Sequence, residues 1–185
     1  LITIAYKLLM DHHTYTLSDL ASQFHLSKSD VLDCVTRIQT WCEKFDVTIT
    51  LKRKQGIIID ASGSDLSNAV LHLNQLSSNE IKVEDLILQE LPQGHIQRIH
   101  HIIKKHIQAS ELQTSDNQVR QLLVHLILII KRSNSEELDW ESNPTSLAIA
   151  RQCIKDINQQ LGYQLTDETS QLFSFFISYH FNQFD

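Results

Sequence analysis

His125 has the most informative chemical setting in this 185-residue chain. It lies in the apolar run LLVHLILIIKR, and Arg132 follows seven residues later, two turns along the same helix face. A buried histidine can simply hydrogen-bond to a neighbour within the core. Near a helix surface, it can instead accept a phosphoryl group whose charge a nearby Arg or Lys balances. The residues alone leave both roles open.

A second set of candidate residues is hydroxylic or basic and suits contact with nucleic acid. The set consists of Ser27, Lys28 and Ser29 at the start of an expected helix, and of Lys52, Arg53 and Lys54 in an expected hairpin. Hydroxyl groups and cations commonly bind DNA phosphates. Solvated hairpin charges are an equally good interpretation of the last three residues, which we call the wing cations.

The other reactive residue types lack the spacing of a catalytic or metal site. Cys34, Cys42 and Cys153 form no Cys-x-x-Cys pair, and we expect buried, reduced thiols. The sequence contains no Gly-rich phosphate loop, Gly-x-Ser-x-Gly elbow or His-Glu-x-x-His motif. We therefore expect neither an enzyme nor a bound cofactor or metal.

Four neighbouring histidines resemble a metal cluster only superficially: His95, His100, His101 and His106. Their spacing differs from the i, i+4 pattern that presents two imidazoles on one helix face, so we expect a solvated polar face. We expect residues 11–13 to form a turn. The acidic segment 133–144, with Trp140, is expected to be an exposed loop.

The elements that would position the hydroxylic and basic residues predict a winged helix-turn-helix over residues 1–64. Residues 1–10 form a first helix, and Thr16 or Ser18 can cap a second, whose apolar face is Leu17, Leu20, Ala21 and Phe24. His25-Leu26 ends that helix, and Ser27 caps a longer one. Residues 47–51 alternate with period two, residues 54–56 can turn, and residues 57–59 return as a second strand. This order places one helix to enter a major groove with a wing beside it.

The rest of the chain predicts helices only. We expect a helical connector over residues 65–92, with helices near 66–76 and 83–91, and a regulatory helical bundle over residues 93–185. The bundle helices are expected at 95–109, 117–131, 144–161 and 166 to about 181, the third ending at Gly162. The predicted fold class is all-α with a small β-hairpin wing.

Charge and hydropathy limit the possible partners. Residues 1–61 hold seven basic and seven acidic residues, so the excess of acid that gives the net charge of −6 lies in the remainder. A general nucleic-acid binder normally shows a basic excess, so this balance weakens the DNA interpretation without excluding it. The sequence has no run of about 18 apolar residues, and we expect a cytoplasmic protein with no membrane contact. Because Leu1 is not a start methionine, we expect a fragment of a longer protein.

Two parts of the chain resemble proteins controlled by the sugar phosphotransferase system (PTS). Residues 1–63 resemble the second helix-turn-helix of PTS-regulated transcriptional activators such as the mannitol-operon type. The shared motifs are Ser27-Lys28-Ser29, Lys52-Arg53-Lys54, Gly56-Ile57 and Gly63-Ser64-Asp65. Residues 117–132 resemble the opening of a PTS regulation domain, a module of sugar-regulated antiterminators and activators in which an arginine follows a histidine by seven residues. Residues 148–168 resemble the next helix of that module, its glycine exit and its Asp-Glu entry.

The resemblance implies a regulator of carbohydrate use that is phosphorylated on His125, with Arg132 as the phosphate partner. It also implies double-stranded DNA, the phosphocarrier protein and enzyme II components as partners, and a homodimer whose interface responds to the added charge.

Three departures from the family pattern keep two alternatives open. Phe175 occupies the position of the family's second histidine, with His180 five residues further on, and this favours a virulence-type regulator with a degenerate regulatory domain. Asp30 and Asp33 lie in the recognition helix, and Asn68 replaces an arginine. Because carboxylates repel phosphates, the two aspartates favour an interaction module that no longer binds DNA, although one could read a cytosine amino group.

Overall fold

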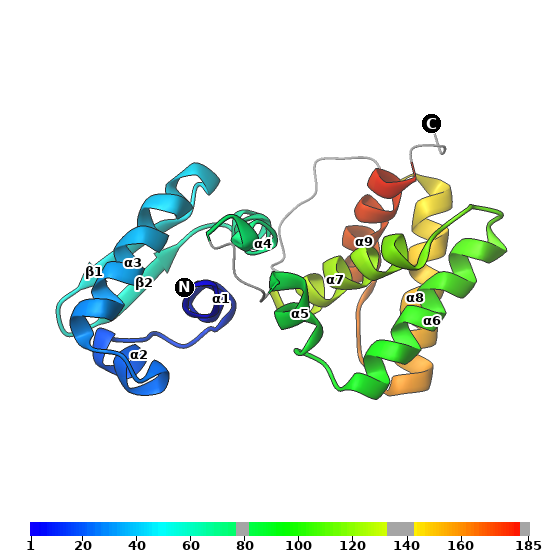
Figure 1. The fold of residues 1–185 in the computed structure, drawn as a ribbon. Helices are drawn as coiled ribbons and strands as arrows, with labels where there is room; N and C mark the ends of the chain where they lie inside the picture. The colour runs from blue at the N-terminus through cyan, green and yellow to red at the C-terminus, as the bar shows by residue number, and fades with distance from the viewer. Residues whose placement is uncertain (77–81, 133–142, 182–185) are drawn as a thin grey trace. The chain divides into compact units, whose positions relative to one another are not determined.

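The computed structural model describes residues 1–76, 82–132 and 143–181 of the chain. It divides into two compact units, Leu1–Asp85 and Leu86–Asp185. Figure 1 labels their helices and strands. Most described residues are helical, and one antiparallel sheet of two strands completes the fold. The predicted fold class, all-α with a small hairpin, is confirmed.

The first unit contains a short helix, a tight turn, a longer helix and a hairpin in sequence. Its elements are α1 (Ile2–Met10), α2 (Leu17–Phe24), α3 (Lys28–Cys42), a 3₁₀ turn (Glu43–Phe45), β1 (Thr48–Lys52), β2 (Gly56–Asp60), α4 (Gly63–Leu71), a second 3₁₀ turn (Leu73–Leu76) and the start of α5 (Val83–Leu88). Helix α2 packs on α3, α3 lies against β1, and α1 contacts both α3 and α4. One side of α3 is therefore buried in the core of this unit, and the opposite side is exposed.

Side-chain caps determine where α2 and α3 begin. The Thr16 hydroxyl accepts from the Asp19 backbone N–H at 3.0 Å, and the Asp19 carboxylate accepts from the Thr16 N–H at 2.9 Å. This reciprocal capping box selects Thr16 over Ser18 as the cap. His25 then adopts a left-handed conformation (φ 55°) that ends α2, and the Ser27 hydroxyl caps α3 through the Asp30 N–H. The expected boundaries of both helices follow from these local bonds.

The turn of the hairpin lies one residue earlier than predicted. Strand β1 extends to Lys52, which pairs with Gly56, so the turn is residues 53–55 instead of 54–56. Gly56 has φ +97°, and a Cβ there would lie 2.6 Å from the Tyr15 carbonyl oxygen. That same oxygen accepts from the Ile57 N–H at 2.8 Å. Only glycine allows this approach, which ties the hairpin to the segment before α2.

The second unit is a helical bundle. Besides the end of α5, it contains α6 (Gln93–Ala109), α7 (Asp116–Arg132), α8 (Pro144–Leu161) and α9 (Asp167–His180). Helix α6 packs on α7 and α8, and both of these pack on α9, so each of the four helices contacts two others. On α7, Leu122, Leu123 and Val124 are buried, as are the residues from Leu126 to Ile129. This burial agrees with the expectation of a central, nearly all-apolar helix.

Polar bonds fix the junction between α8 and α9. Gly162 adopts φ +73° and ends α8 as expected. The Asn158 side chain donates to the Leu165 carbonyl and accepts from the Leu165 N–H, each at 3.0 Å. Arg151 donates two hydrogen bonds to the Asp167 carboxylate, at 2.9 and 3.0 Å. These contacts set how α9 begins and therefore which of its faces meets α7.

The cysteines follow the expectation only in part. Cys42 and Cys153 are buried and Cys34 is half-buried, and all three are free thiols. Burial raises the pKa of Cys42 to about 11, which keeps it protonated at neutral pH. Within the described ranges, no helix combines the length and apolar character needed to cross a bilayer.

Candidate functional site

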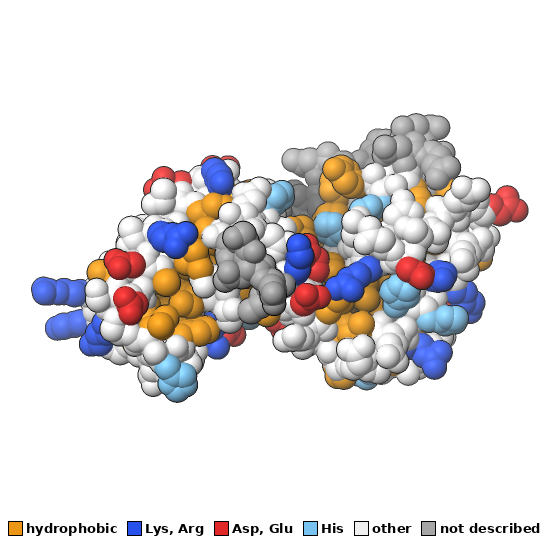
Figure 2. Space-filling view, viewed as in Figure 1, with side chains coloured by type: hydrophobic (Ala, Val, Ile, Leu, Met, Phe, Trp, Pro, Cys, Tyr) orange, Lys and Arg blue, Asp and Glu red, His pale blue; other side chains and the backbone are white. Residues whose placement is uncertain are grey.

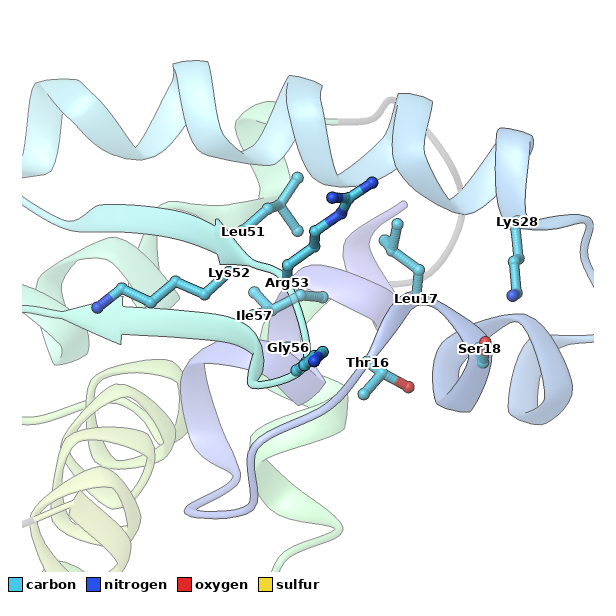
Figure 3. A pocket seen from close by; sticks show the side chains of 10 residues that line it. Thr16, Leu17, Ser18, Lys28, Leu51, Lys52, Arg53, Gly56 and Ile57 are labelled. Carbon is cyan, nitrogen blue, oxygen red and sulfur yellow. The ribbon is translucent and has the colours of Figure 1, made fainter.

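The basic candidate residues of the first unit, Lys28 and the wing cations, gather around one hollow, which Ser27 and Ser29 do not line. Its volume is about 480 Å³. It is lined by Thr16, Leu17, Ser18, Lys28, Leu51, the wing cations, Gly56 and Ile57. Lys28 comes from the start of α3, and the wing cations come from the end of β1 and the turn. In Figure 3, Lys28 extends down from α3 and Arg53 rises from the turn, on either side of Leu17, whereas Lys52 extends away along the hairpin.

The sequence-predicted contact residues of this unit are all exposed. Ser27, Lys28 and Ser29 lie at the beginning of α3, and the wing cations lie at the hairpin tip. Figure 2 shows basic side chains projecting from that end of the unit. The Ser27 hydroxyl oxygen is engaged in capping, but its proton can still be donated to a phosphate. The structure thus groups these residues on one accessible, cationic surface.

Sequence reasoning missed Arg37, which is exposed on α3 beyond the basic start of the helix. The helical period could have indicated it, because Arg37 lies one turn after Asp33, on the same exposed face. Asp30 has a local role, since its backbone N–H donates to the cap and its carboxylate lies in the first turn, where the helix dipole favours negative charge.

In the second unit, the half-buried side chain of His125, on α7, faces α9. Its ring stacks on Phe176 with centroids 4.1 Å apart and an interplanar angle of 16°. Nδ1 is buried and has no hydrogen-bond partner among the described residues. Burial lowers the pKa of His125 to about 4, and neighbouring His180 adds to the lowering. At neutral pH the imidazole is therefore uncharged and keeps one nitrogen lone pair.

The tertiary structure brings His180 to His125, although counting along the sequence singled out Phe175. The two histidine rings have centroids 5.8 Å apart, and His180 Nε2 is also buried without a partner among the described residues. Burial lowers the pKa of His180 as well. Phe175 is 43% exposed and lies beside Phe176, which contacts His125. No feature of the α9 sequence alone indicates which of its residues faces α7.

Arg132 is the last residue of α7, and its side chain lies outside the described part of the chain. The acidic segment with Trp140 also lies outside it. The predicted pairing of Arg132 with a phosphate on His125 therefore stays a prediction.

Two of the four histidines of α6, His95 and His106, make close polar contacts, although a solvated helix face was expected. His106 Nε2 lies 2.6 Å from an Asp156 carboxylate oxygen, and both side chains are largely buried. His95 Nδ1 lies 2.7 Å from the Tyr163 hydroxyl. His101 is exposed and His100 half-buried. Among the residues that the structure describes, no group of three or more His, Cys, Asp or Glu is placed to hold a metal ion.

Comparison with known proteins gives a relative of regulatory function. No family model matches the chain. It is 20% identical over 132 residues to the transcriptional regulator ManR of Bacillus subtilis (strain 168), a match that covers 71% of this chain. Because each compact unit is shorter than the matched length, the similarity reaches into both. The chain spans about a fifth of the length of ManR. The similarity is thus to part of a transcription regulator.

Proposed function

We propose that this chain is a DNA-binding and regulatory part of a transcription regulator of carbohydrate use. The observation that carries the proposal is the cationic surface of the first unit, where Lys28 at the start of α3 and the wing cations are exposed and line one hollow. Similarity to a transcription regulator supports it. We assign DNA binding to residues 1–64, a connecting role to residues 65–92 and regulation to residues 93–185.

In this proposal α3 enters the major groove of double-stranded DNA and the hairpin lies along the neighbouring backbone. Lys28 and the wing cations neutralise phosphates, and the hydroxyls of Ser27 and Ser29 donate to phosphate oxygens. The balanced charge of residues 1–61 keeps non-specific affinity low, so a few placed cations supply the attraction.

Regulation is assigned to His125 as the acceptor of a phosphoryl group from the phosphocarrier protein or an enzyme II component of the PTS. A neutral imidazole is the nucleophilic form, and the low pKa of His125 maintains it at neutral pH. Because Nδ1 is enclosed, Nε2 is the nitrogen that would attack phosphorus while the bond from phosphorus to the donor breaks. The added charge of about −1.5 to −2 could not remain stacked against Phe176 without strain, so α9 would have to shift.

In this proposal a homodimer interface changes when α9 shifts. Phe175 and Tyr179 lie one turn apart on α9 and are 43% and 71% exposed. A phosphate between α7 and α9 would move these two side chains, and with them any contact that they make to a second copy. No catalysis is assigned to the chain.

Phosphorylation of the 185-residue chain tests the regulatory part. We expect phosphocarrier protein and phosphoenolpyruvate, with the enzyme that couples them, to label His125, and His125→Ala to abolish the label. His101→Ala is the matched control, because His101 is exposed on α6 outside this site. Mass spectrometry under acid-sparing conditions locates the phosphate. Label on His100 or His101 with none on His125 would refute the assignment.

A degenerate regulatory domain is the second candidate. The specific observation in its favour is Phe175 at the position of the second histidine, together with the burial of His125 Nδ1 and of His180 Nε2. In that case the phosphorylation mixture labels no histidine, whereas DNA binding by the first unit persists.

A further inference from the structure

Helix α3 has a buried side and a continuous exposed side. Val31, Val35 and Ile38 are fully buried. The exposed side carries Ser29, Leu32, Asp33, Thr36, Arg37 and Thr40. At about 3.6 residues per turn, these six positions form one face opposite the core. A helix with this division can present the whole face to a partner without any cost in packing.

The hairpin marks one edge of that face. The Gln39 side chain donates to the Ile49 carbonyl of β1 at 2.6 Å, so the edge that holds Gln39 faces the hairpin. Leu32 lies seven residues before Gln39 and therefore on the same edge, and Thr36 is one turn from Leu32. Asp33 and Arg37 lie on the part of the face farther from the hairpin. The exposed face thus consists of two parallel strips.

The strip beside the hairpin is largely apolar. Leu32 is 40% exposed and offers an apolar side chain on an otherwise polar helix face. The Thr36 hydroxyl donates to the Leu32 carbonyl at 2.8 Å, so its proton is engaged within the helix and the hydroxyl oxygen can only accept. An exposed leucine next to a threonine methyl matches the C5 methyl group of thymine, the apolar feature of the major groove.

The other strip is charged. Asp33 and Arg37 are both exposed and stand four residues apart, a spacing at which side chains of a helix are neighbours. A guanidinium can donate two bonds to guanine O6 and N7, and a carboxylate can accept from a cytosine amino group. Against phosphates, Asp33 is repulsive. It lowers affinity for DNA in general and is compensated only where a base donates to it.

We propose that the exposed face of α3 selects the base sequence, with Arg37 and Asp33 specifying adjacent G·C pairs and the Leu32–Thr36 strip specifying thymine. The inference rests on the proposed function, in which α3 enters the major groove, and adds the identity of the DNA that is bound. The hairpin then provides affinity independent of sequence, and the two surfaces of the first unit have separate tasks.

The test is selection of bound duplexes from a library with a randomised central segment, using the 185-residue chain and the variants Arg37→Ala, Asp33→Asn and Leu32→Ala. For Arg37→Ala, we expect discrimination for guanine to fall about tenfold to a hundredfold at one or two adjacent positions. Asp33→Asn should bind unselected duplexes more tightly and lose the preference for cytosine. Leu32→Ala should relax a thymine position only.

Lys105→Ala is the matched control, because Lys105 is exposed on α6, and it should leave the selected sequence unchanged. All four altered side chains are exposed, so unchanged thermal unfolding is expected and is checked for each variant. DNA binding by the unaltered chain with the same base preference in Arg37→Ala and Leu32→Ala would overturn this inference alone. No binding of any duplex at low salt would overturn the proposed function as well.

Discussion

The two compact units present their candidate residues in opposite ways. In the first, Lys28, Arg53 and the exposed face of α3 project into solvent from a framework built by capping bonds and a small core. In the second, His125 of α7 is half-buried, with its Nδ1 buried and its ring stacked on Phe176 of α9. An exposed cationic surface can bind a partner by charge at once, whereas a neutral imidazole stacked on α9 can carry a phosphoryl charge only if that packing gives way. The first arrangement suits recognition, and the second suits a switch.

The largest effect is expected for the framework of the first unit. Leu20 is fully buried in α2, so Leu20→Ala should lower the free energy of unfolding by about 2–5 kcal/mol. Leu32→Ala is the matched control, because Leu32 is 40% exposed, and its loss should stay below about 0.5 kcal/mol. Denaturant unfolding measures both. Equal losses would show that the two faces of this unit are not divided as described.

Acid should destabilise the second unit through His125. Its folded pKa of about 4 lies below the unfolded value of about 6.5, so the unfolded chain binds the proton first as pH falls. Stability should therefore be complete above about pH 6.5 and decline by about 3 kcal/mol as the pH approaches 4.

His125→Gln removes this titration, so the variant should show a flatter profile of unfolding free energy between those pH values. His101→Gln, at an exposed position of α6, should retain the slope of the unaltered chain. An unchanged slope in His125→Gln would mean that folding does not desolvate the His125 ring, and the contrast between the two units would disappear.

A smaller effect is expected for the cationic hairpin. Replacement of Lys52, Arg53 and Lys54 by Ala should weaken binding to all duplexes by roughly tenfold to a hundredfold and reduce the salt dependence by up to about three phosphate contacts. Titration at graded salt measures both quantities. A triple Ala variant at Lys82, Lys105 and Lys155, which removes the same charge from other exposed positions, is the control. If the two triple variants lose affinity equally, net charge and not the placement of the wing cations determines binding.

The smallest effect is expected at the junction of α8 and α9. Arg151 and Asp167 form two hydrogen bonds but are both about half exposed, so Arg151→Ala should lower the free energy of unfolding only slightly. Lys155→Ala, on the same helix, should cost less. Thermal unfolding compares the two. A loss for Arg151→Ala as large as that expected for Leu20→Ala would show that this junction, and not the apolar packing of α7 on α9, holds the second unit together.

Much of the fold was predictable because its signals are local. The apolar spacing of α3, the Ser27 cap and Gly162 after α8 each act within a few residues, so sequence patterns locate them. For α2, the sequence limited the cap to Thr16 or Ser18, and the structure selects Thr16. The hairpin turn was predicted one residue too late. The contact that fixes Gly56 there is the Tyr15 carbonyl, which is remote in sequence.

The same distinction between local and remote contacts applies to the candidate sites. The sequence by itself determined the winged helix-turn-helix order, the basic residues at the start of α3 and in the hairpin, and the apolar setting of His125, because charge and helical period are properties of neighbouring residues. Only the tertiary structure decided that His180 faces His125. The rotation of α9 about its axis depends on packing against α7 and α8 and on the Asn158 and Arg151 bonds, and residue spacing encodes none of these.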